Sequence, residues 1–390
     1  MSVEIAEIEQ AARTVAAEIR RTPVLVSREL GRRLGSPVFL KAENLQRTGS
    51  FKLRGALNKL AELDPAALAA GVVAASAGNH AQAVAVAASS RGASAELVMP
   101  AAAPIAKVEA VRAYGGRVRL VDGVYDDAAA TARELVETEG RTLIPPFDDP
   151  AVIAGQGTLG LELAEQLPEV SLVVVPVGGG GLAAGVAIAV KQRIPGARVI
   201  GVQADARTRG TICDGIAVKR PGELTGPLLE RLLDGTVTVS DDEVAEAMVL
   251  LLERSKQVVE GAGAAPVAAL LAGKVKAPAQ GAVCAILSGG NVDATRLVEC
   301  IRLGETSAGR RLVFATVLPD RPGALASLLA AVADTGANVL DVSHVREGVD
   351  LHVRETAIRL VLQTDGPQHG ERVLAAVRER GFEAEAEGSR

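Results

Sequence analysis

Aromatic side chains are scarce in this chain. Only 2% of its 390 residues are Phe, Trp or Tyr, and Trp is absent, whereas 48% of the residues are hydrophobic. The core must therefore be built mainly from Ala, Val, Leu and Ile, a composition that suits buried parallel strands covered by helices. A chain of this length has room for two or three domains.

The chain also has few cysteines, no concentrated charge and no long apolar run. Cys213, Cys284 and Cys300 are widely spaced and odd in number, so they fit neither a disulfide framework nor a zinc site, and no metal is expected. The net charge is only −5 and no basic cluster stands out, which argues against nucleic acid. No apolar run is long enough to span a bilayer, and residues 1–20 lack the pattern of a signal peptide. We therefore expect a cytoplasmic protein without a membrane partner.

Apolar runs alternate with segments of helical periodicity up to about residue 304. The predicted strands lie at 38–42, 72–76, 95–100, 117–122, 171–177, 198–204 and 282–288. The predicted helices lie at 5–20, 56–63, 79–91, 104–114, 126–139, 157–167, 182–193, 241–256, 262–272 and 292–304. This order predicts an α/β fold with parallel sheets, in which functional loops follow the carboxyl ends of strands.

The pattern changes after residue 304, where residues 305–311 are small and polar and are predicted to be a linker. Beyond it, strands and helices are predicted in the order β-α-β-β-α-β, a ferredoxin-like unit, at 312–318, 322–334, 338–345, 355–364, 367–380 and 382–386. We therefore expect a larger domain over 1–304, with a smaller lobe at about 54–150, and a separate domain over 312–390.

Lys52 opens a predicted helix directly after the turn-forming residues 48–50. Beside Phe51 and Leu53 its amine would be partly desolvated, which favours the neutral form that attacks a carbonyl to make a Schiff base. An ordinary surface lysine is the alternative interpretation.

Small residues also follow the predicted strand at 72–76. Ser76, Ala77 and Gly78 bring backbone N–H groups together at a helix start, where they can hold an anion such as a carboxylate. Asn79 could in addition hydrogen-bond a phenolic oxygen. A simple helix cap, with His80 packed or solvated, would explain the same pattern.

The strongest single signal is a run of glycines between a strand and a helix: Gly178, Gly179, Gly180 and Gly181. Their unshielded backbone donors predict a phosphate cradle. A dinucleotide loop is the rival, but Gln203 stands where an acidic residue should bind the ribose. The lysine of a nucleotide-triphosphate loop is also missing from this motif.

A fourth motif, Ser-Gly-Gly-Asn at 288–291, places the Ser288 hydroxyl at the end of another strand, although a turn and helix cap would look the same. Together the four motifs supply a Schiff-base lysine, a phosphate cradle, a carboxylate cradle and a neutral hydroxyl. That combination fits pyridoxal 5′-phosphate.

Five motifs in order and spacing, at 50–56, 76–80, 155–158, 178–181 and 288–291, resemble those of the serine/threonine dehydratases among the fold type II (tryptophan synthase β-like) pyridoxal phosphate enzymes. The likeness spans about residues 5–304. The C-terminal stretch, with Asp-Arg-Pro-Gly-Ala-Leu at 320–325 and Gly-Ala-Asn at 336–338, resembles a regulatory ACT domain, as in the shorter threonine dehydratases.

The resemblance implies a role for each motif residue. Lys52 is the catalytic Schiff-base residue, Phe51 lies against the pyridine ring, Asn79 contacts the 3′ oxygen and Ser288 contacts the pyridine nitrogen. The glycines at 178–181 bind the phosphate. The residues implied to cradle or adjoin the substrate carboxylate are Ser76, Ala77, Gly78, Asn79, His80, Gln156 and Gly157.

The implied activity is loss of water and ammonia from L-threonine to give 2-oxobutanoate, and from L-serine to give pyruvate. Serine dehydratase and serine racemase remain alternatives, although related racemases carry a second serine where this chain has Ala77. Cystathionine or cysteine synthesis matches the motifs less well. A non-catalytic amino-acid sensor with a retired site is the alternative from another class.

The resemblance also implies an amino-acid effector, isoleucine or valine, between paired C-terminal domains of a homo-oligomer, a dimer or a tetramer. Its candidate contacts are Asp320, Pro322, Gly323 and Asn338. A domain that only helps oligomerisation is the alternative. Residues 203–216 form a shorter segment than in relatives, and Gln203 replaces an acidic cation ligand of some of them, so a divalent cation site is not expected.

Overall fold

The computed structural model describes residues 3–205, 211–218, 220–345 and 351–387, so that part of the shortened segment at 203–216 lies outside the described residues. The chain divides into two compact units, Met1–Asp293 and Ala294–Arg390. The division precedes the boundary expected after residue 304, because helix α13 (Ala294–Ser307) contacts strand β11 (Arg311–Pro319) of the second unit. The predicted linker at 305–311 is correspondingly too long.

A six-stranded sheet forms the larger lobe of the first unit, in the order β1-β2-β10-β7-β8-β9. All neighbours are parallel except β1 and β2. The central strands β7 and β10 are buried almost throughout, which explains their continuous apolar sequences. The bounds are β1 Val24–Val26, β2 Val38–Ala42, β7 Val170–Pro176, β8 Arg198–Ala204, β9 Gly235–Val239 and β10 Ala282–Leu287.

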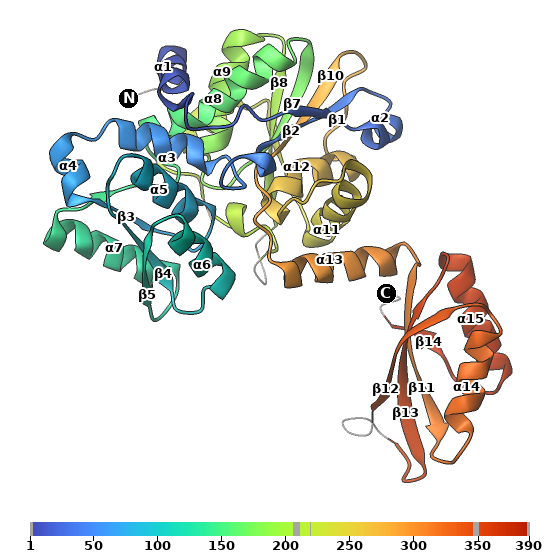
Figure 1. The fold of residues 1–390 in the computed structure, drawn as a ribbon. Helices are drawn as coiled ribbons and strands as arrows, with labels where there is room; N and C mark the ends of the chain where they lie inside the picture. Colours follow the sequence, from blue (N-terminus) through green and yellow to red (C-terminus); the bar gives the residue numbers. More distant parts are fainter. Residues whose placement is uncertain (1–2, 206–210, 219, 346–350, 388–390) are drawn as a thin grey trace. The chain divides into compact units, whose positions relative to one another are not determined.

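Helices cover both faces of this sheet, with α8 and α9 on one side and α11 and α12 on the other (Figure 1). No helix among the described residues is long and apolar enough to cross a membrane. The helices of this lobe are α1 Ile5–Val15, α2 Arg28–Leu34, η1 Glu43–Leu45, α8 Pro150–Gln166, α9 Gly181–Arg193, η2 Asp214–Ile216, α10 Thr225–Leu232, α11 Asp241–Leu250, the π-helical turn η3 Leu251–Ser255 and α12 Gly261–Leu271.

The smaller lobe is built on a parallel four-stranded sheet in the order β5-β4-β3-β6. Alternate residues of its strands face opposite sides. Val73, Ala75 and Val98 pack on α7, whereas Val72 and Leu97 pack with α3 and α5. The bounds are α3 Lys52–Ala61, α4 Pro65–Ala70, β3 Val72–Ala75, α5 Asn79–Ser90, β4 Ala95–Pro100, α6 Ile105–Ala113, β5 Arg117–Val121, α7 Tyr125–Glu139 and β6 Thr142–Leu143.

Two helices that position the site begin earlier than the sequence pattern predicts. Helix α3 starts at Lys52 rather than at residue 56. Helix α8 starts at Pro150 rather than at residue 157, because Asp149 accepts hydrogen bonds from the N–H groups of Ala151 and Val152 and so caps the helix.

The second unit confirms the predicted β-α-β-β-α-β order. Its sheet is antiparallel, in the ferredoxin-like order β12-β13-β11-β14. Helices α14 and α15 pack together over a core that includes Phe314 and Leu360. The bounds are α13 Ala294–Ser307, β11 Arg311–Pro319, α14 Ala324–Ala333, β12 Asn338–Val345, β13 Glu355–Gln363, α15 Pro367–Glu379 and β14 Glu385–Ala386.

Candidate active site

The loop before Lys52 is joined to the Ser-Gly-Gly-Asn loop that follows β10. Ser50 and Gly289 form an isolated antiparallel bridge, and the Phe51 N–H donates to the Ser288 carbonyl at 3.1 Å. Lys52 and the Ser288 motif, distant in sequence, therefore lie together as predicted from the motifs.

The Lys52 amine contacts a backbone carbonyl and lies over an aromatic ring. Its Nζ donates to the Pro146 carbonyl at 2.7 Å and lies 5.2 Å from the centre of the Phe51 ring. Burial lowers the pKa of the amine to about 8, against the opposing charge of Glu260. Near neutral pH the uncharged, nucleophilic share of the free amine is therefore far larger than in an exposed lysine.

The glycine loop ends β7 and begins α9, and it is shaped by close packing. A Cβ on Gly179 would lie 2.2 Å from the Phe147 ring, and one on Gly180, whose φ is +95°, would lie 2.8 Å from Thr225. Thr225 also donates its hydroxyl to the Gly179 carbonyl at 2.6 Å. The loop therefore has no room for side chains, and the first-turn N–H groups of α9 lack intrahelical partners, which suits a phosphate.

The small-residue loop after β3 is anchored at both ends. The Ser76 N–H donates to the Val98 carbonyl at 3.1 Å, and the Gly78 N–H donates to the Ser76 hydroxyl at 3.2 Å. Gly78 is the N-cap of α5. Ala77 and Asn79 complete a helix start that can accept an anion.

His80 is buried, and its Nε2 lies 2.8 Å from the Ile144 carbonyl. Burial, reinforced by the Lys52 charge, lowers its pKa to about 3. The imidazole is therefore neutral and donates to a backbone carbonyl. It does not supply a cation to a substrate carboxylate.

Gln156 and Gly157 lie inside contacts between helices. Gln156 is 1% exposed, and its Oε1 accepts from the Gly55 N–H at 3.2 Å. A Cβ on Gly157 would collide with Ile8 of α1 and with the Gly185 carbonyl of α9. Their described contacts are packing contacts, and their place beside the substrate stays a prediction.

The sequence motifs missed one ionisable group, Glu260, the N-cap of α12. Its Oε1 accepts from Asn79 Nδ2 at 2.7 Å, and its N–H donates to the Gly289 carbonyl at 3.1 Å. Burial raises the pKa of Glu260 to about 7, although the Asn79 hydrogen bond opposes the shift. A lone acidic residue before a helix of Gly and Ala was the only available signal.

Phe147 was missed as well. It fills the space beside the glycine loop, and its neighbour Pro146 accepts the Lys52 hydrogen bond. Because aromatic residues are so few in this chain, each of them was a candidate for a specific structural role, and this was the available signal for Phe147. These contacts link Lys52, the glycine loop, Asn79 and Ser288 into one site.

The residues expected to bind an effector are separated within the second unit. Asp320 follows Pro319, which pairs with Glu355 at the start of β13, whereas Asn338 pairs with Gln363 at its end. Eight residues of strand span roughly 26 Å. Pro322 and Gly323, the N-cap of α14, lie on the Asp320 side. One small ligand cannot touch both ends of a single unit.

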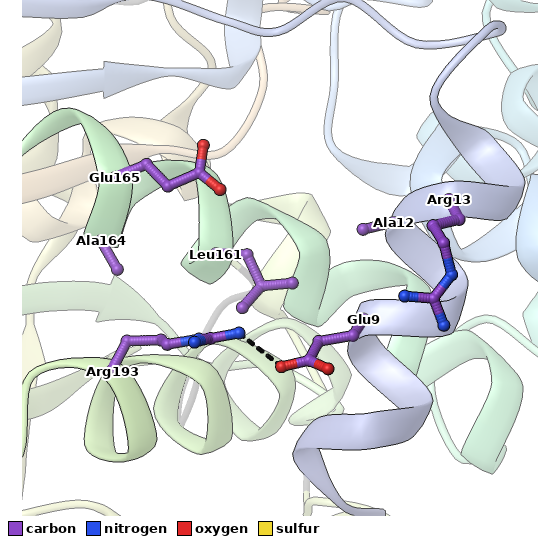
Figure 2. A pocket seen from close by; sticks show the side chains of 7 residues that line it. All are labelled: Glu9, Ala12, Arg13, Leu161, Ala164, Glu165 and Arg193. Atoms are coloured by element: carbon purple, nitrogen blue, oxygen red, sulfur yellow. Dashed lines mark hydrogen bonds and ion pairs between the residues drawn. The ribbon is translucent and has the colours of Figure 1, made fainter.

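A surface hollow between α1, α8 and α9 is lined by other residues (Figure 2). Arg193 and Glu9 form an ion pair across it, and Glu165 pairs with Arg21 at 2.9 Å. No residue of the four motifs lines it. The chemistry lies instead in the loops that follow the strands.

The site fits a cofactor that carries a carbonyl and a phosphate. Lys52 supplies a desolvated amine, and the tightly packed glycine loop leaves its N–H groups as the available binding surface. Ser288, whose carbonyl accepts from the Phe51 N–H, is 2% exposed and offers a hydroxyl.

Comparisons with known proteins agree with this chemistry. The L-threonine ammonia-lyase of Thermotoga maritima is 43% identical over 403 residues, covering 99% of this chain and 100% of that protein. Maize serine racemase has a TM-score of 0.73 at 35% identity, covering 77% of this chain and 97% of that chain. The processed form of threonine deaminase isoform 2 from Solanum lycopersicum has a TM-score of 0.71 at 36% identity, covering 78% of this chain and 95% of that chain.

The family model described as pyridoxal-phosphate dependent enzyme matches residues 15–289, which lie within the first compact unit and include Lys52, the loop at 76–80, the glycine loop and Ser288. The chain therefore belongs to the pyridoxal-phosphate dependent enzyme family.

Proposed function

We propose that this chain is a threonine ammonia-lyase that converts L-threonine to 2-oxobutanoate and ammonia with pyridoxal 5′-phosphate. The observation that carries the proposal is the union of Lys52, the glycine loop and Ser288 in one site, in a chain similar over its whole length to an L-threonine ammonia-lyase. The same site would act on L-serine to give pyruvate.

Lys52 would hold the cofactor covalently, against Phe51, with the phosphate on residues 178–181 and the pyridine nitrogen at Ser288. When bound, the cofactor supplies an electron sink for the charge left at the substrate Cα. The free amine of Lys52, whose pKa is lowered to about 8 by burial, would take the proton from the substrate Cα. The N–H groups at 76–79 would orient the substrate carboxylate.

A neutral group at the pyridine nitrogen suits elimination. A carboxylate there would hold the nitrogen protonated and prolong the life of the carbanion, which favours racemisation and transamination. The uncharged Ser288 hydroxyl would not hold that proton, which favours elimination of the substrate's β-hydroxyl over return of a proton to the substrate Cα.

Serine racemase is the second candidate, because the maize enzyme matches about as well as threonine deaminase in structure. Ala77 has no hydroxyl to return a proton on the opposite face of the substrate. Incubation of the purified enzyme with L-threonine, L-serine and their D-forms, followed by 2-oxo acid and chiral amino-acid analysis, tests both functions. We expect L-threonine to be turned over fastest, and D-serine forming as fast as pyruvate would contradict the proposal.

For the second unit we propose a regulatory ACT-like role, supported by its ferredoxin-like topology and by the full-length match to the Thermotoga relative. Because Asp320 and Asn338 lie at opposite ends of β13, an effector that contacts both must bridge two copies of the unit. Isoleucine or valine bound in this way would require a homo-oligomer. Binding of effector and of substrate would then change each other's affinity by the same factor.

The test compares the full chain with a chain that ends at residue 293, over a panel of amino acids. We expect isoleucine or valine to change the activity of the full chain only. Equal responses of the two chains would leave the second unit with a role in oligomerisation alone.

A further inference from the structure

Asn291 ends the Ser-Gly-Gly-Asn motif, and the proposed function gives it no role. Its Nδ2 donates to the Thr48 carbonyl at 2.8 Å and to Asn79 Oδ1 at 2.7 Å. A third acceptor, Gln82 Oε1, lies farther away at 3.5 Å. Asn291 therefore joins the loop that precedes Lys52 to the first residue of α5.

The Thr48 carbonyl determines which way the Asn291 amide points. A carbonyl oxygen only accepts hydrogen bonds, so the NH₂ end of Asn291 must face it. The orientation of an amide is decided by such partners of fixed polarity. The second hydrogen of the same NH₂ group goes to the oxygen of Asn79, which fixes the oxygen end of that amide.

Glu260 fixes the opposite end of the Asn79 amide. Asn79 Nδ2 donates to Glu260 Oε1 at 2.7 Å, and this carboxyl group only accepts once it is ionised, above its raised pKa of about 7. Asn79 thus has a donor at its oxygen and an acceptor at its nitrogen. A flipped amide would place its NH₂ group against the NH₂ group of Asn291 and its oxygen against the Glu260 oxygen. Its second N–H has no acceptor among the described residues.

The loop before Lys52 is also shaped around the Asn291 amide. Gly49 has φ +73°, and a Cβ there would lie 2.5 Å from Asn291 Oδ1. The Gly290 N–H donates to the Gly49 carbonyl at 2.8 Å. The oxygen end of Asn291 is therefore packed against glycine, and its nitrogen end is left for Thr48 and Asn79.

We propose that Asn291 is a positioning residue that holds the Asn79 amide so that an N–H, and not the carbonyl oxygen, faces the phenolic oxygen of the cofactor. The proposal rests on the proposed function, since it requires Asn79 to contact that oxygen. An N–H donor stabilises the ionised phenolic oxygen of the bound cofactor, whereas an amide oxygen would repel it.

Asn291→Asp tests the proposal because it replaces the donor with acceptors. The Thr48 carbonyl and the Asn79 oxygen would then both face a carboxylate, and the Asn79 amide would turn. We expect apoenzyme titrated with pyridoxal phosphate to show about ten-fold weaker affinity, equivalent to about 1.4 kcal/mol. The ratio of visible to near-ultraviolet absorbance of the bound cofactor should also fall, because the ionised form is less stabilised.

A double-mutant cycle with Asn79→Ala separates positioning from general structural support. Once the Asn79 amide is absent, Asn291→Asp should change neither cofactor affinity nor absorbance further. Asn44→Asp is the matched control, because Asn44 donates to the Val258 carbonyl at 3.2 Å and packs against Gly290 beside the same motif. It should keep the parental affinity and spectrum.

Parental affinity and absorbance in Asn291→Asp would overturn the proposal, and so would an undiminished effect of this change in the Asn79→Ala background. If Asn79→Ala alone leaves both readouts at parental values, the contact of Asn79 with the cofactor is refuted, and the proposal with it. Neither readout uses threonine, so a failure of L-threonine as substrate is a separate result. Asn291→Ala enters the same cycle, with the same expectation, if Asn291→Asp does not fold.

Discussion

Arg54 lies fully buried two residues after Lys52 and provides a sharp test of the energetics behind the site. Its guanidinium donates to both oxygens of Glu43 at 2.8 Å and to the two oxygens of Glu162 at 2.7 and 2.9 Å. These bonds tie the start of α3 to η1 and to α8. Replacement of Arg54 by Met would leave the fully buried Glu43 carboxylate without its main counter-ion.

Breaking a buried ion pair in this way costs about 3–5 kcal/mol. For a unit of this size each kcal/mol lowers the melting temperature by a few degrees, so we expect Arg54→Met to melt roughly 6–20 °C below the parent. Thermal unfolding of the full chain, followed by circular dichroism, measures the difference. Arg47→Met is the control, because Arg47 pairs with Glu18 at 2.9 Å on the surface and should cost less than about 1 kcal/mol.

The stability difference between the parent and Arg54→Met should also depend on pH. Burial alone would raise the pKa of Glu43, but the charge and hydrogen bonds of Arg54 outweigh burial and lower the pKa below 4.5. The pair therefore stabilises the parent above that pH, and this contribution is lost as the pH falls through the lowered pKa. In Arg54→Met, burial raises the pKa of Glu43, so mild acid removes the buried charge.

The stability gap between parent and variant should consequently narrow from pH 7 toward pH 4.5, the ordinary pKa of a glutamate. Glu43→Gln in the Arg54→Met background should recover part of the lost stability at pH 7. A loss below about 1 kcal/mol, or a gap that widens in acid, would refute the reasoning.

Three further changes test the site directly. Lys52→Ala should abolish 2-oxo acid production and the visible absorbance of the Schiff base, and turnover within about ten-fold of the parent would assign the chemistry to another lysine. Gly179→Ala, whose Cβ would lie 2.2 Å from the Phe147 ring, should lose cofactor affinity and thermal stability, whereas Gly226→Ala, with open space around it, should behave as the parent in both assays. Burial raises the pKa of Glu260 to about 7, so the parent acquires a buried negative charge as the pH rises, whereas Glu260→Gln does not. The melting temperature of Glu260→Gln minus that of the parent should therefore increase from pH 5 to pH 8. A difference that does not change with pH would contradict this reasoning.

Long strands that are buried on both faces were predictable from the sequence, and short, partly exposed elements were not. Strand β7 carries Leu and Val at successive positions because both of its faces are covered, so its apolar run is visible without the structure. Strand β9 has mostly exposed or partly exposed residues, and its pairing with β8 is what makes it a strand. The sequence pattern likewise gave no prediction for helices α2, α4 and α10 or for strands β1 and β6. The cap at Asp149 was visible in the sequence as Asp-Pro and would have placed the start of α8 correctly.

The candidate site shows a similar division. Lys52, the glycine loop and Ser288 each follow a recognisable local pattern, so their convergence could be expected from the order of strands. The link between Asn79 and Glu260 joins residues 181 positions apart, and no local pattern encodes it. The neutral state of His80 likewise depends on its burial beside Ile144.

The strand order of the central sheet has a consequence for synthesis of the protein. Strand β10 lies between β2 and β7, although it is translated long after both. At ribosomal speeds of about 5–20 residues per second, the segment from Ala42 to Leu287 takes roughly 10–50 s to emerge. The facing edge of β2 lacks its native neighbour throughout that time, and the facing edge of β7 lacks it from Pro176 onward. Open strand edges invite pairing with other chains. We therefore expect a nascent chain that lacks β10 to need protection from such pairing, and a premature stop before β10 to yield a fragment that aggregates.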